Sequence, residues 1–211
     1  MSLFARLHAS IFGSSGPEAK IAIIGLAGVG KNTLLRLINE DQIQTICHPN
    51  SPYLYYKTGK NYHLRMNYVM TYVGYDEPGM SKIWLGEQFC DSDGIILVID
   101  DDHDSKAEAA EWMEAYVKGF RRERWPDHFP DVKIREGIPW LILANTKKSD
   151  NKLTIGEVQR FMGLDELQID YYVEVVNILT GEGVANALKW LRQRVDTPVE
   201  NRLQMREVKS S

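Results

Sequence analysis

Residues 25–33 decide the fold: they read Gly25-Leu26-Ala27-Gly28-Val29-Gly30-Lys31-Asn32-Thr33, with the spacing G-x-x-x-x-G-K. A short β-branched apolar run, residues 20–25, leads into them, and a helical pattern, residues 33–40, follows. In this context glycines let the backbone wrap around phosphate oxygens, the helix N-terminus adds positive potential, and Lys31 reaches the outer phosphates. The stretch therefore predicts a phosphate-binding loop between a strand and a helix.

The loop supplies most of the candidate site residues. Its backbone groups and the Lys31 ammonium are expected to bind phosphate. A Gly-rich turn without a ligand is the alternative, which the flanking strand, the helix and the lysine disfavour. The residues assigned to the phosphates are Gly25, Ala27, Gly28, Val29, Gly30, Lys31, Asn32 and Thr33.

Asn32 departs from the usual pattern, because a Ser or Thr whose hydroxyl ligates magnesium normally follows the lysine. An amide oxygen can ligate a hard cation, but the longer side chain displaces it. Thr33 is one position further along the helix and points elsewhere. We therefore expect a weakened Mg²⁺ site at Asn32, and a preference for a diphosphate-bound or empty state.

Composition limits the class of protein. The chain has 211 residues, 44% of them hydrophobic, which suits one buried core and a single domain. Its net charge of -4 disfavours nucleic acid as a partner. No apolar run approaches the length of a bilayer span, and the two cysteines have no partners at zinc-ligand spacing. We expect a reducing, cytoplasmic compartment.

Patterning divides the chain into four segments. Residues 1–12 predict an amphipathic helix, 13–19 a Gly- and Ser-containing hinge, 20–196 the P-loop domain, and 197–211 a disordered polar tail. The apolar face of the first helix consists of Leu3, Phe4, Leu7, Ile11 and Phe12.

The remaining periodicity indicates an α/β fold. Strands are expected at 63–72, 94–99, 140–144 and 172–176, and helices at 105–122, 154–162 and 184–194. Continuous apolar runs such as 94–99 are typical of strands covered on both faces. We predict a three-layer sandwich around a mostly parallel, six-stranded sheet.

A second motif, Asp76-Glu77-Pro78-Gly79, follows the strand expected to end near residue 74. Asp76 could hold a magnesium-bound water, and the N–H of Gly79 could bind a terminal phosphate and report its loss. Alone, Asp-x-x-Gly is equally a plain turn. Its place after a P-loop and a strand favours the phosphate-sensing role.

Together these motifs resemble the Arf/Sar family of small GTPases over nearly the whole chain. Thr45 and the run 48–51 resemble the first switch of the Sar type with an extra residue, whereas an Arf-type alignment puts His48 where a magnesium-ligating Thr belongs. The resemblance is also carried by the amphipathic start, the opening Gly25-Leu26, Asp76 to Gly79 before Lys82-Ile83-Trp84, residues 94–100, and Trp190-Leu191.

The resemblance implies a Ras-like P-loop GTPase fold and a cycle between GDP and GTP. It implies a role in intracellular vesicle trafficking, on ER or Golgi membranes, with coat or effector proteins and an exchange factor as partners. The N-terminal helix would bind the membrane surface reversibly; Ser2 excludes myristoylation. The alternative is a helix that packs on its own domain.

Departures from the family affect hydrolysis and base recognition. Met80 stands where Gln or His positions the attacking water, so hydrolysis is expected to be weak and no catalytic residue is assigned. The base element N-K-x-D is matched only at Asn145, and Lys147 and Lys148 follow; losing the carboxylate weakens the choice of guanine. Leu179, in a turn at 177–180, would offer backbone groups. Asn145 could instead cap the following loop.

Two other functions stay open. The first is a degenerate pseudo-GTPase that serves as a protein-binding scaffold, which is favoured by Asn32, Met80, Thr146 and Lys148. The second is an active P-loop ATPase or kinase-like enzyme, which is disfavoured because no insertion resembles a lid over an acceptor site.

Overall fold

A computed structural model describes residues 17–48, 51–71, 91–101, 134–146 and 153–200, together with 107, 109, 110, 113, 114, 117 and 118. The statements below concern these residues. Several sequence expectations lie outside them: the helix at 1–12, most of the hinge, Asp76, Gly79, Met80, Lys147, Lys148 and the tail beyond 200.

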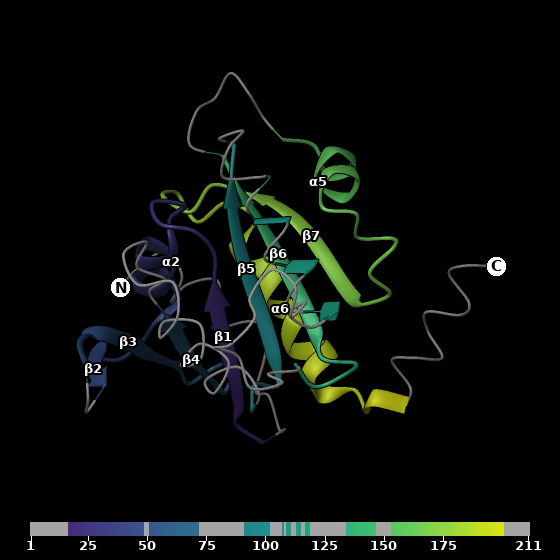
Figure 1. Ribbon diagram of the computed structural model, residues 1–211. Coiled ribbons are helices and arrows are strands. Elements are labelled where there is room, and N and C mark those ends of the chain that lie inside the picture. The colour runs from purple at the N-terminus through teal and green to yellow at the C-terminus, as the bar shows by residue number, and fades with distance from the viewer. Residues whose placement is uncertain are drawn as a thin grey trace.

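The described chain forms one seven-stranded sheet in the order β2-β3-β4-β1-β5-β6-β7 (Figure 1). Neighbours from β4 to β7 pair in parallel, whereas β2–β3 and β3–β4 pair antiparallel. The strands are β1 (Ala19–Ile24), β2 (Gln44–His48), β3 (Ser51–Asn61), β4 (Met66–Thr71), β5 (Gly94–Asp100), β6 (Pro139–Asn145) and β7 (Asp170–Val176).

The sheet differs from the expected one at its β2–β4 side. It has seven strands instead of six, and the strand expected at 63–72 begins only at Met66. Residues 62–65 form the turn between β3 and β4, where Arg65 has φ 51° and the side-chain oxygen of the buried Asn61 accepts a 2.8 Å hydrogen bond from the Leu64 N–H. The left-handed backbone conformation of Arg65 is incompatible with a strand, so β4 begins only after it.

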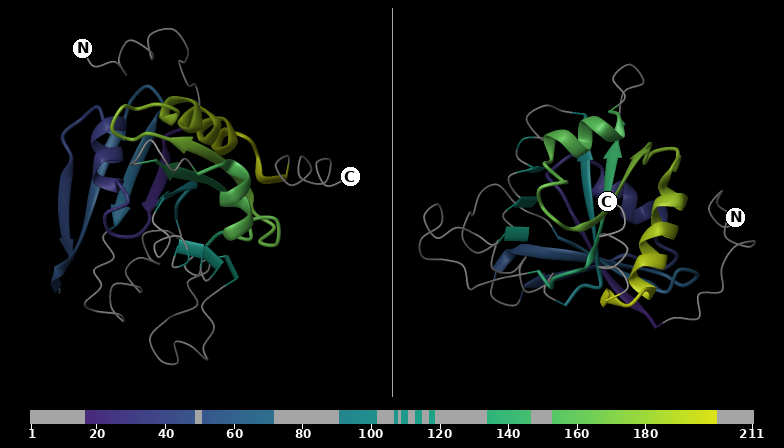
Figure 2. Two further views of the ribbon diagram at one scale, coloured as in Figure 1. Left: turned by 90° about the horizontal axis from the view of Figure 1, so that it is seen from above. Right: turned by 90° about the vertical axis from the view of Figure 1, so that its right-hand side faces the viewer.

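Helices cover both faces of the sheet, which confirms the three-layer sandwich (Figure 2). On one face α2 (Lys31–Ile38) and α6 (Val184–Asp196) pack with Ile21, Ile23, Ile96 and Leu141. On the other, α5 (Ile155–Phe161) and helical residues between 107 and 118 pack with alternate residues of the same strands. Burial on both faces explains why β5 and β6 lack polar alternation.

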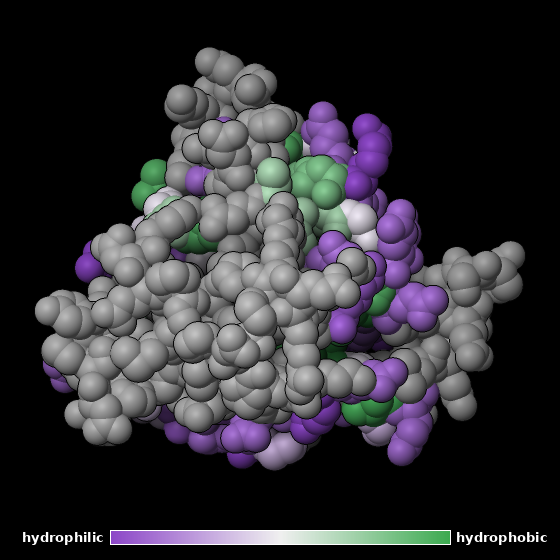
Figure 3. Space-filling view, in the orientation of Figure 1, coloured by the Kyte–Doolittle hydropathy of each residue, from purple (hydrophilic) through white to green (hydrophobic). Residues whose placement is uncertain are grey.

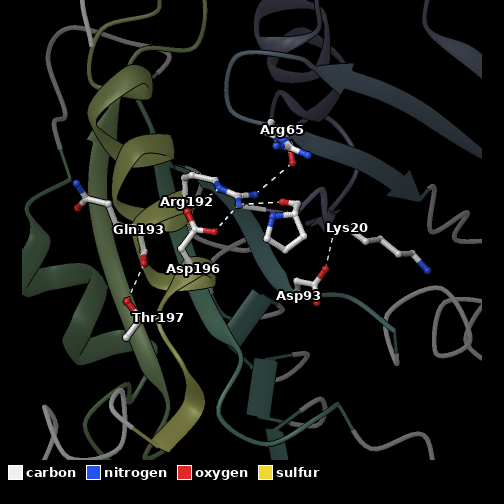
Figure 4. Close-up of polar contacts among 8 residues, drawn as sticks. Lys20, Arg65, Asp93, Arg192, Gln193, Asp196 and Thr197 are labelled. Carbon is white, nitrogen blue, oxygen red and sulfur yellow. Dashed lines mark hydrogen bonds and ion pairs between the residues drawn. The ribbon is translucent and has the colours of Figure 1, made fainter. Parts of the chain in front are cut away.

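The buried Arg192 connects α6 to two distant segments (Figure 4). Its guanidinium donates to the carbonyl oxygens of Pro17 at 2.9 Å and Arg65 at 3.2 Å, and it pairs with Asp196 one turn away. Ala19 N–H also donates to the Arg65 carbonyl, at 2.9 Å. The start of β1, the β3–β4 turn and the end of α6 are therefore held together by one side chain.

Among the coloured residues of Figure 3, hydrophilic ones gather at the upper right and along the lower rim. Within the described part of the chain, no helix is both long enough and apolar enough to cross a membrane. The exposed large apolar side chains there come from separate elements: Ile46, Tyr62, Ile155, Leu179 and Val199.

Candidate functional site

Three glycines shape the loop that joins β1 to α2. Gly25, Gly28 and Gly30 have φ angles of 139°, 81° and 110°, a backbone region that residues other than glycine rarely adopt. A Cβ on Gly25 would lie 2.3 Å from the Val98 carbonyl oxygen, and one on Gly30 would lie 2.9 Å from the Asn145 side-chain nitrogen. The curl of the loop and its contact with β5 and β6 both require glycine.

Lys31 places a cation inside this curl. Its side chain is 6% exposed, and its ammonium donates to the carbonyl oxygens of Gly25 at 2.6 Å and Leu26 at 2.5 Å. Burial lowers the pKa of Lys31 to about 8. The ammonium is therefore held by backbone dipoles at the start of α2, where an anion would relieve the cost of its burial.

Asn32, the next residue, meets a second lysine. The Lys57 ammonium, from β3, donates to the Asn32 side-chain oxygen at 3.0 Å. Both side chains are partly buried. The oxygen expected to ligate Mg²⁺ therefore accepts a hydrogen bond from a cationic group.

Asn145, at the end of β6, bridges two loops. Its amide nitrogen donates to the Val29 carbonyl at 3.0 Å, and its amide oxygen accepts from the Ile178 N–H at 3.1 Å. The side chain is buried, at 5% exposure. The neighbouring Thr146 hydroxyl and N–H both donate to the Val176 carbonyl, at 3.1 and 2.9 Å. These contacts tie the phosphate-type loop to the segment after β7.

The backbone amides of the turn at 177–180 are hydrogen-bonded within the protein. The Asn177 side-chain oxygen accepts from the N–H groups of Leu179 and Thr180, at 3.0 and 3.1 Å. The Leu179 side chain is 79% exposed, whereas Ile178 is buried. The backbone donors that the sequence assigned to a ligand here are engaged by side chains of the protein itself.

A family model of the ADP-ribosylation factor family matches residues 4–195. The chain belongs to the ADP-ribosylation factor family. Family members bind GTP and GDP, usually with Mg²⁺. The small-GTPase fold expected from the motifs is thus confirmed for this chain.

Two solved structures of family relatives share the fold. One is the Arl6 BBS3 small GTPase of Trypanosoma brucei with bound GppNp, at 18% identity and a TM-score of 0.59, covering 84% of this chain and 97% of that one. The other is the ADP-ribosylation factor-like GTP-binding protein, small COPII coat GTPase SAR1, of Encephalitozoon cuniculi with GDP, at 16% identity and a TM-score of 0.59, covering 91% and 85%.

The residues around Asn32 do not fit the Mg²⁺ that family members usually bind. Magnesium needs near-octahedral oxygen ligands. Here the Asn32 oxygen accepts a hydrogen bond from the Lys57 ammonium. A dication placed about 4 Å from that ammonium would be repelled by about 8 kcal/mol at an effective dielectric constant of about 20. Of the side chains that the structure describes, no three His, Cys, Asp or Glu form a group able to hold a metal.

The structure brings most of the assigned residues to one edge of the sheet. The loop residues Gly25 to Thr33 and Asn145 lie together where β1 and β6 end, and Leu179 lies in the turn that Asn145 contacts through Ile178. Asp76, Gly79 and Lys147 are outside the described residues. Sequence reasoning missed Lys57, because it comes from a strand that the periodicity did not reveal.

Proposed function

We propose that this chain binds GTP and GDP at residues 25–33 and acts as a switch in intracellular vesicle trafficking, with weak intrinsic hydrolysis. One observation carries the proposal: three positive-φ glycines curl the backbone around the buried Lys31 ammonium. Carbonyl dipoles offset the charge of that ammonium only in part. The phosphates of a nucleotide would supply full negative charge at a helix N-terminus.

The base is proposed to lie beside Asn145, Lys147 and the turn containing Leu179. Two features should weaken the preference for guanine over adenine. Lys148 replaces the carboxylate that reads the guanine edge, and the amides of 178–180 already donate to Asn145 and Asn177. A site that lacks fixed partners for one base discriminates weakly against another.

The switching parts of the proposal rest on the sequence and the family. Gly79 would sense the terminal phosphate, Asp76 lies in the same motif, and Met80 would leave hydrolysis slow. The amphipathic segment 1–12 would bind endomembranes of the ER or Golgi reversibly, as coat or effector proteins are recruited and an exchange factor releases GDP. The Encephalitozoon relative is a small COPII coat GTPase, which supports this assignment.

A protein-binding scaffold without nucleotide is the second candidate function. It is favoured by the hydrogen bonds that the Asn145 and Asn177 side chains make with backbone groups, which hold the loops of the site together without any ligand. A scaffold of this kind would keep the fold and its partners while losing the switch.

Calorimetric titration of nucleotide-stripped protein with GDP, a nonhydrolysable GTP analogue and ATP tests the proposal. Lys31→Met should abolish binding, because it removes the cation inside the loop. Lys60→Met is the matched control, since Lys60 pairs with Glu18 at 2.7 Å, away from the loop. Absence of binding to every nucleotide by the parent protein would support the scaffold instead.

A further inference from the structure

We propose that the Lys57 ammonium takes the place of the magnesium ion, so that this chain binds nucleotide phosphates without a divalent cation. The inference rests on the proposed nucleotide binding and specifies its ligand as a metal-free nucleoside di- or triphosphate.

Lys57 is fixed in place by its strand. In β3 it pairs with Thr45 of β2 on one side and Met70 of β4 on the other, so strands flank it on both sides. Its backbone therefore has little freedom to carry the ammonium away from the site.

The strand itself is packed closely on α2. A Cβ on Gly59 would lie 2.7 Å from the Asn39 side-chain oxygen, and that oxygen also accepts from the Lys60 N–H. The Glu40 N–H donates to the Lys60 carbonyl at 2.9 Å, and Asn61 donates to the Ile38 carbonyl at 2.9 Å. These contacts join the end of α2 to β3 at positions two to four residues beyond Lys57, so the helix that carries Asn32 and the strand that carries Lys57 are packed together.

The charge arrangement suits a polyanion without a metal. Lys31 lies within the loop and Lys57 lies beside the next residue of α2, so two ammonium groups stand near the first turn of the helix. The Lys57 ammonium carries a full positive charge, and its bond to the Asn32 oxygen at 3.0 Å holds that charge beside the loop. The Asn32 oxygen orients the Lys57 ammonium. This role would explain why Asn occupies a position where a magnesium site requires a hydroxyl.

Chelation distinguishes this arrangement from a metal-bridged one. Where an ion bridges protein and phosphate, removing the ion weakens binding by mass action. Where a lysine provides the positive charge, EDTA has no effect on the protein's contacts.

The test is calorimetric titration of the full, nucleotide-stripped chain with GDP in Mg²⁺ and in EDTA. We expect the two dissociation constants of the parent to agree within about twofold. Lys57→Met should weaken GDP binding in EDTA by about tenfold to a hundredfold, the range of a charged hydrogen bond. Lys60→Met, on the same strand and with its ammonium on Glu18, should change neither constant.

A gain-of-function variant makes the test independent of any loss of folding. Asn32→Thr combined with Lys57→Met restores a hydroxyl and removes the competing charge, so its GDP binding should become magnesium-dependent. Mn²⁺ observed by electron paramagnetic resonance in the presence of GDP should be retained by this double variant and not by the parent.

Two results would overturn the inference while leaving nucleotide binding intact: tight binding by the parent only with Mg²⁺, or an unchanged EDTA dissociation constant in Lys57→Met. Failure of the parent to bind GDP in either condition would instead overturn the proposed function, and this inference with it.

Discussion

The amide nitrogen of Asn145 donates a 3.0 Å hydrogen bond to the carbonyl of Val29, a residue 116 positions earlier in the chain. The amide oxygen of the same side chain accepts a hydrogen bond from the Ile178 N–H at 3.1 Å. The loop after β1 and the segment after β7 therefore share one buried amide, and the geometry of the candidate site depends on it.

Asn145→Ala should lower the free energy of unfolding by about 2 to 4 kcal/mol, because each buried partner left without a hydrogen bond costs about 1 to 3 kcal/mol. Urea denaturation measures the change. Asn67→Ala is the control, since the Asn67 side chain donates to the exposed Glu18 at 3.0 Å, away from the bridge. Equal effects of the two substitutions would show that the bridge contributes little.

Gly25→Ala and Gly28→Ala form a second pair. Both glycines have positive φ, but a Cβ on Gly25 would lie 2.3 Å from the Val98 carbonyl oxygen, whereas one on Gly28 meets nothing within 4 Å. Gly28→Ala should cost about 1 to 2 kcal/mol from backbone strain alone. Gly25→Ala should cost more, because backbone must move. Thermal unfolding decides between them, and equal midpoints would contradict the packing of the loop on β5.

Lys31 should make stability depend on pH. Its folded-state pKa of about 8 lies below the usual range, so as pH rises through that value the folded protein loses a proton that the unfolded chain still holds. The parent should therefore gain about 2 to 3 kcal/mol relative to Lys31→Met between about pH 7 and about pH 10. Denaturation of both proteins across this range measures the gain. A constant difference would mean that the buried ammonium is not destabilised.

Arg192→Met should destabilise the fold by about 2 to 4 kcal/mol, since it leaves the Pro17 and Arg65 carbonyls without their donor. Hydrogen exchange should increase at the start of β1 and at the β3–β4 turn together. Arg36→Met, at an exposed position in the last turn of α2, is the control. Exchange that rises in only one of the two segments would argue against their linkage by Arg192.

The core of the fold could be predicted from the sequence because its strands are buried on both faces. The apolar runs at 94–99 and 140–144 became β5 and β6, and the glycine loop lies where its spacing placed it. The edge of the sheet could not be predicted, because β2 exposes Gln44, Thr45 and Ile46 and carries no apolar alternation.

The site was predictable only in its local part. The glycines and Lys31 act within one loop, so their spacing reveals them. The contact between Asn32 and Lys57 depends on how β3 packs on α2, and the bonds of Asn145 depend on where β6 and β7 end; neither arrangement leaves a pattern in the sequence.

The central claim is that residues 25–33 hold the phosphates of a nucleotide. A crystal structure of the protein grown with GDP tests it most directly. The account predicts diphosphate density inside the loop, with phosphate oxygens within hydrogen-bonding distance of the Lys31 ammonium and of the loop amides. Density for GDP at another place, or an empty loop at saturating GDP, would contradict it.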